Sequence, residues 1–115
     1  MMIYNMNSIV QNNRNINNDN NNDNTIWGVC IPKVEDTLSS EYIKCIMEKT
    51  KMGSIKQYTE LAWKNDPRYK RILMRIQVSS TNENIGLWKE RLHSGESINI
   101  VYNFPRVWKM YLAKN

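Results

Sequence analysis

The sequence has little glycine, proline, cysteine and histidine: four glycines, three prolines, two cysteines and one histidine among 115 residues. Two cysteines are too few for the disulfide scaffold of a small secreted protein, and they lack the CxxC spacing of a zinc site. We therefore expect Cys30 and Cys45 to be free, buried thiols in a reducing intracellular compartment. The one histidine, His93, lies near the end of an expected helix, where it complements the helix dipole.

Catalytic motifs are also missing. The sequence contains no nucleophile elbow, no glycine-rich phosphate loop and no cluster of metal ligands. No apolar run approaches the roughly 18–20 residues that a membrane helix needs. Met1–Val10 is interrupted by Asn5, Asn7 and Ser8, unlike a signal peptide. We expect a protein that is not an enzyme, has no cofactor or metal, and does not enter a membrane.

What is abundant is asparagine, isoleucine and lysine, a bias typical of an AT-rich genome. The polar, asparagine-rich tract Asn5–Asn24 has almost nothing apolar to bury, which predicts a disordered tail at residues 1–24 before a single domain at residues 25–115. The formal net charge is +5. A positive balance favours anionic partners, although many lysine-rich proteins are basic without such a partner.

The first half of the domain predicts a strand, a helix and a strand. Ile26–Ile31 is a short apolar run that ends at Pro32, which indicates a strand. Ser39 has the side chain of a helix N-cap, and the helix continues through Met47 until Gly53 closes it. Ile55–Trp63 alternates in character and predicts a second strand, with Tyr58 on the face opposite Ile55 and Leu61.

The second half repeats this order after a turn at residues 64–67. Arg71–Val78 is the clearest strand, because apolar side chains alternate with Arg71, Leu73 and Arg75. Ser80-x-x-Glu83 is a capping box that predicts a helix from Ser80 to His93, and Gly95 follows its end. Ile98–Tyr102 and Val107–Leu112 are two further strands, separated by a proline turn.

The resulting order is β-α-β-β-α-β with one extra short strand before the last. This order predicts an α+β, ferredoxin-like sandwich: a four-stranded antiparallel sheet that carries both helices on one face. The other face of the sheet would be open to a partner.

The same segments resemble the RNA-recognition-motif (RRM) family. Val29–Val34 is similar to its first-strand motif, and Lys70–Ile76 occupies the place of its third-strand motif. The run Ile100–Met110 is similar to the end of short RRM-like proteins of giant, mimivirus-like DNA viruses. That resemblance implies a viral protein of the host cytoplasm, the viral factory or the virion, with RNA or single-stranded nucleic acid as its partner.

The sequence departs from the RRM pattern at the positions where that family stacks bases on aromatic rings. The outward positions are Cys30, Arg71, Leu73 and Arg75, none of them aromatic. We therefore expect a mainly electrostatic interface, to which the following residues contribute: Arg71, Arg75, Lys56, Tyr58, Lys33 and Lys70.

Two interpretations of the partner stay open. Leu73 and Cys30 on the open face would equally suit a protein partner or a second copy of the chain. Trp27 and Trp108 lie near strand ends and are candidates for exposed anchors in such an interface. Trp63 and Trp88 are expected to pack in or beside the core.

Overall fold

The computed structural model describes residues 26–113, so the disordered tail predicted for residues 1–24 lies outside the described residues. The protein is an α+β fold with two helices and a five-stranded antiparallel sheet. In chain order the elements are β1 (Ile26–Glu35), α1 (Ser40–Lys49), β2 (Gly53–Ala62), β3 (Tyr69–Val78), α2 (Ile85–His93), β4 (Ile98–Asn103) and β5 (Arg106–Leu112).

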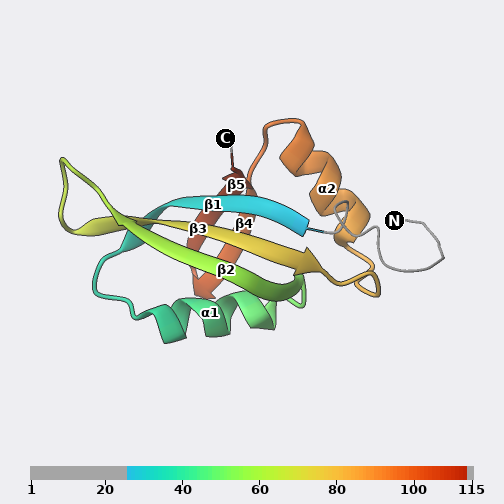
Figure 1. The fold of residues 1–115 in the computed structure, drawn as a ribbon, viewed down its shortest axis with the longest axis horizontal. Coiled ribbons are helices and arrows are strands. Elements are labelled where there is room, and N and C mark those ends of the chain that lie inside the picture. Colours follow the sequence, from blue (N-terminus) through green and yellow to red (C-terminus); the bar gives the residue numbers. More distant parts are fainter. Residues whose placement is uncertain (1–25, 114–115) are drawn as a thin grey trace.

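The sheet has the strand order β2-β3-β1-β5-β4. Figure 1 shows β1, β3 and β2 running side by side, while the β4–β5 hairpin crosses their direction steeply. β5 pairs with β1 only at Val29↔Leu112 and Cys30↔Tyr111, so the hairpin diverges from the sheet soon after this point. In the same view α1 lies on the β2 side and α2 on the β1 side.

A single hydrophobic core holds these elements together. It takes alternate residues of β1 and β3, such as Val29 and Met74, because a strand turns every second side chain to the same face. Both helices bury residues in this core, for example Ile43 of α1 and Leu92 of α2. The core therefore lies on one face of β1 and β3 and leaves their other face uncovered by the helices.

The start of α1 confirms the sequence prediction, but its end does not. The Ser39 hydroxyl accepts a hydrogen bond of 3.1 Å from the Tyr42 amide, as an N-cap should. The helix ends at Lys49, and Lys51 takes the left-handed backbone conformation with φ of 61°. Gly53 is instead the first residue of β2, where a Cβ would lie 2.0 Å from the backbone oxygen of Gln77. Glycine at position 53 therefore allows the close approach of β2 to β3.

The predicted capping box of α2 is wrong, because the helix starts at Ile85 and not at Ser80. The Asn82 side chain accepts a hydrogen bond of 2.8 Å from the Asn84 amide and donates one of 2.9 Å to the Lys51 oxygen. These bonds hold the segment before α2 in a turn against the end of α1. The prediction that His93 ends the helix is confirmed.

The first strand is longer than predicted, because it continues through Pro32 to Glu35. Its register against β3 shifts between Ile31 and Val34, which places one extra residue in β1. A proline is tolerated in a strand at such a bulge, where its missing N–H interrupts no ladder bond.

The predicted burial or exposure of three residues is wrong. Trp27 and Trp108 are core residues, with only 7% and 2% of their surface exposed. Each shares its strand face with other buried residues: Trp27 with Val29 on β1, and Trp108 with Met110 on β5. Cys45 is exposed on α1, although it was expected to be buried, and Cys30 is half-buried. Both cysteines are free.

Candidate nucleic-acid interface

The face of the sheet opposite the core forms the candidate interface, which we call the open face. Cross-strand partners share a face, and the register therefore assigns to it Gly28 and Cys30 of β1, Gln57, Thr59 and Leu61 of β2, and Arg71, Leu73, Arg75 and Gln77 of β3. These positions carry two cations and no carboxylate. The face is therefore locally positive.

Arg71 and Arg75 are both exposed on the open face, as predicted. They lie four residues apart on one strand, which separates their Cα atoms by about 13 Å. Within residues 26–113, neither guanidinium takes part in an ion pair. Gly28 lies directly across from Arg75 and has no side chain to cover it. Both guanidinium groups can therefore bind an anion without first losing a carboxylate partner.

Between the arginines, β1 and β3 present apolar side chains. Cys30 of β1 pairs with Leu73 of β3 on one side and with Tyr111 of β5 on the other. Burial raises the pKa of the Cys30 thiol, although the nearby positive charge of Arg71 partly opposes this effect. The thiol is thus neutral at ordinary pH and adds to the apolar centre, beside the exposed ring of Tyr111.

Aromatic side chains bound one end of the open face, and the sequence analysis missed them. Tyr69 begins β3 on the same face as Arg71, and Trp63 follows β2 opposite Tyr69. The two ring centroids are 6.0 Å apart, at an interplanar angle of 52°. The Trp63 Nε1 group donates a hydrogen bond of 2.7 Å to the main-chain oxygen of Pro32, which fixes the indole across β3.

Cations surround this aromatic end. The Nζ atom of Lys33 lies 4.4 Å from the centroid of the Tyr69 ring, and the Arg68 guanidinium lies 5.5 Å from it. Arg68 also forms two hydrogen bonds of 2.9 Å to the carboxylate of Asp66. Those bonds lower the pKa of Asp66 to about 2. Lys33 is therefore available near the open face, whereas Arg68 is partly neutralised.

The predicted placement of Tyr58 on the open face is wrong. A register shift between Ile55 and Gln57 places one extra residue in β2, and Tyr58 therefore pairs with Met74 on the core face. Its hydroxyl donates a hydrogen bond of 2.6 Å to Glu60, and the Nζ atom of Lys44 lies 4.8 Å from its ring centroid. Burial, together with the Glu60 carboxylate, raises the pKa of Tyr58 well above its ordinary value.

Lys70 does not lie on the open face either, because it alternates with Arg71 and is 6% exposed. Its Nζ atom donates to the Leu38 oxygen at 2.6 Å and to the Glu60 carboxylate at 3.0 Å. Lys56 is exposed at the bulge of β2. It lies at the edge of the sheet, not between Arg71 and Arg75.

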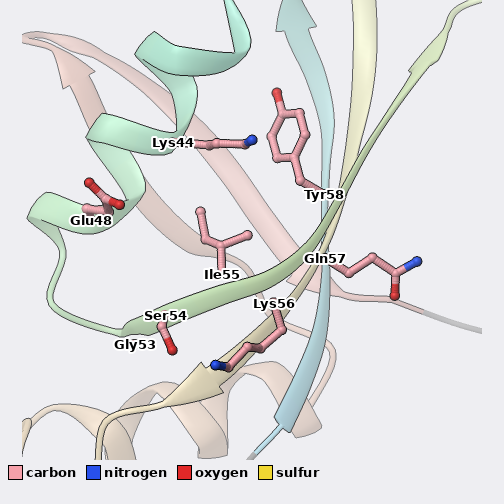
Figure 2. Close-up of a pocket in the computed structure, with 8 residues that line it drawn as sticks. All are labelled: Lys44, Glu48, Gly53, Ser54, Ile55, Lys56, Gln57 and Tyr58. Carbon is pink, nitrogen blue, oxygen red and sulfur yellow. The ribbon is translucent and has the colours of Figure 1, made fainter.

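A hollow lies at the edge of the sheet, between β2 and α1. It has a volume of about 520 Å³ and is lined by Lys44 and Glu48 of α1 and by residues 53–58 of β2. Figure 2 shows Ile55 and Tyr58 on the side of β2 that faces α1, whereas Lys56 and Gln57 point away from the helix. This hollow is separate from the open face.

Residues 26–113 contain no group of three histidine, cysteine or acidic side chains placed to hold a metal ion. Over the same residues, neither helix has the length and apolar character needed to cross a membrane.

No family model, curated protein or solved structure matches this chain.

Proposed function

We propose that this protein is a non-enzymatic module that binds RNA or another single-stranded nucleic acid weakly through its open face. The observation that carries the proposal is the pair of exposed guanidinium groups, Arg71 and Arg75, whose paired positions on the neighbouring strands carry no carboxylate. Arginine holds phosphate through two parallel hydrogen bonds. The apolar strip between the arginines and the aromatic end at Trp63 and Tyr69 suits the flat, exposed bases of a single strand.

We also propose that the fold is ferredoxin-like and RRM-like. The order β2-β3-β1-β5 and the position of each helix between its strands support two interlocked βαβ halves. In this assignment β4 is the extra strand, joined to β5 as a hairpin. The short pairing of β5 with β1 is a departure from a regular four-stranded sheet.

The experiment is a titration of labelled single-stranded RNA and DNA with the full chain, followed by fluorescence anisotropy at 50 and 200 mM salt. Each phosphate that a protein neutralises on a single strand contributes about −0.7 to the slope of log affinity against log salt. If the protein contacts three or four phosphates, raising the salt from 50 to 200 mM should therefore weaken binding at least about tenfold. An absence of binding at 50 mM salt and tens of micromolar protein would refute the proposal.

A protein partner is the second candidate, and one observation favours it. Leu61 is 44% exposed on the open face, and the adjacent strand places Leu73 beside it at the next position of that face. Exposed apolar side chains that gather on one surface are typical of protein interfaces. Binding of this kind would change little between 50 and 200 mM salt, which separates it from binding to phosphates.

A further inference from the structure

The side chains that β3 presents on the open face lie in one row. The row begins at Tyr69 and continues at every second position with Arg71, Leu73 and Arg75. Six residues separate Tyr69 from Arg75, which corresponds to about 20 Å along the strand. Nucleotides stacked in a single strand rise about 3.4 Å each, so that about six of them span the row. A short single strand that lies along β3 can therefore contact the aromatic end and both arginines at once.

The ring of Tyr69 is the part of this row on which a base can stack. The neighbouring ring of Trp63 is tilted from it by 52°, so the two rings do not close on each other as a stack. Over the Tyr69 ring lies the Nζ atom of Lys33, at 4.4 Å from the centroid. Lys33 is exposed, and within residues 26–113 it takes part in no ion pair that would hold it there. Because a base stacks on a ring more strongly than an exposed cation does, a base can displace Lys33.

Two carboxylates lie near the aromatic end, and an arginine balances the charge of each. Glu35 pairs with Tyr69 in the ladder, but its carboxylate lies 3.8 Å from the guanidinium of Arg106. Asp66 accepts two hydrogen bonds of 2.9 Å from Arg68. The aromatic end therefore remains open to an anionic strand.

We propose that the aromatic end is a nucleobase subsite, in which one unpaired base stacks on Tyr69 in place of Lys33. The displaced ammonium group of Lys33 then binds a phosphate of the same strand. This subsite rests on the proposed function, because Arg71 and Arg75 hold the rest of the strand along β3. A base inside a duplex is already stacked and paired and does not reach the ring. The ligand is therefore a single strand with at least one free base.

An abasic scan of the ligand tests the subsite without altering the protein. Six labelled adenine RNA hexamers each lack one base at a different position, and anisotropy at 50 mM salt measures their affinity for the full chain. We expect loss of the base at one end to weaken binding roughly tenfold, the contribution of one stacked base. Loss of the base at the other end, over Arg75, should leave the affinity nearly unchanged. Equal affinities of the six hexamers would overturn the proposal.

Two variants assign the effect to the ring of Tyr69. Tyr69→Phe keeps the ring and should bind the intact hexamer like the parent. Tyr69→Leu should bind it roughly tenfold more weakly and should no longer distinguish it from the sensitive abasic hexamer. Circular dichroism checks that Tyr69→Leu is folded, and the abasic scan decides alone if it is not. A folded Tyr69→Leu variant that still detects the missing base would overturn the subsite.

Lys33→Gln tests the displaced ammonium group. The salt slope for the intact hexamer should fall by about 0.7, the share of one phosphate contact. For the sensitive abasic hexamer the slope should change less, because Lys33 then stays over Tyr69. Equal changes for both ligands would contradict the displacement.

Failure of the subsite differs from failure of the proposed function. If longer RNA binds through Arg71 and Arg75 but the hexamer does not bind, or binds without regard to the missing base, only the subsite is overturned. If neither the hexamer nor longer RNA binds at 50 mM salt, the proposed function fails and the subsite fails with it.

Discussion

The indole nitrogen of Trp63 donates a hydrogen bond of 2.7 Å to the main-chain oxygen of Pro32, two strands away. Pro32 stands in the bulge of β1, where the register against β3 shifts. The bond therefore ties the bulge of β1 to the residue that follows β2 and fixes the aromatic end of the open face.

A Trp63→Phe variant tests this bond, because it keeps an aromatic ring and removes the donor. We expect the free energy of unfolding to fall by about 1 kcal/mol, the usual net contribution of one hydrogen bond. Urea denaturation followed by circular dichroism measures the change. A stability equal to that of the parent would show that water replaces the indole at Pro32.

Two glycines should respond to alanine in opposite directions. Gly53→Ala places a Cβ 2.0 Å from the Gln77 oxygen, so β2 and β3 must separate, and we expect a loss of about 3 kcal/mol or more. Gly86→Ala, in α2, is the matched control, because nothing lies within 4 Å of the Cβ that alanine would add there. The control should gain about 0.5 kcal/mol through lower backbone entropy of the unfolded chain. Thermal unfolding of both variants measures the two signs.

Glu35 should make the fold sensitive to acid. Burial opposes ionisation of its carboxyl group, but a hydrogen bond of 2.6 Å from Tyr102, a longer one from Trp108 and the charge of Arg106 outweigh burial and lower its pKa. A pKa that is lower in the folded state contributes stability above the unfolded value of about 4.5, and the contribution is lost as pH falls through the folded value.

The stability of the parent should therefore decrease between pH 5 and pH 3 more steeply than that of a Glu35→Gln variant. Urea denaturation at several pH values measures both curves. Glu60 has a lowered pKa as well, since bonds from Tyr58 and Lys70 outweigh its burial, and its contribution remains in the variant. Parallel curves for parent and variant would contradict the assignment to Glu35.

The strands and α1 could be predicted from the sequence, because side-chain alternation and the Ser39 cap are local signals. The face of Tyr58 could not, since one extra residue at the bulge of β2 reverses every later side chain of that strand. The sequence did indicate that Trp27 and Trp108 are buried, but their positions near strand ends favoured the interpretation that they are exposed. Each stands two residues from another apolar core position.

The aromatic end of the candidate site also had a signal. Tyr69 stands two residues before Arg71, so extending the period of two by one step places it on the open face. The Trp63–Pro32 bond had none, because it joins residues 31 positions apart through a bulge that no local pattern marks. The capping motif at Ser80 failed for a similar reason, because Asn82 bonds to Lys51, just after α1 and far away in the sequence.

The most direct test of the proposed function compares two double variants that remove the same charge. Arg71→Gln/Arg75→Gln changes the open face, whereas Lys49→Gln/Lys89→Gln changes exposed cations on the two helices. In anisotropy titrations with single-stranded RNA, we predict that the first variant binds at least about tenfold more weakly at 50 mM salt. Its salt slope should also fall by roughly 1.4, the share of two phosphate contacts. The helix variant should bind like the parent, and equal weakening in both variants would contradict binding at the open face.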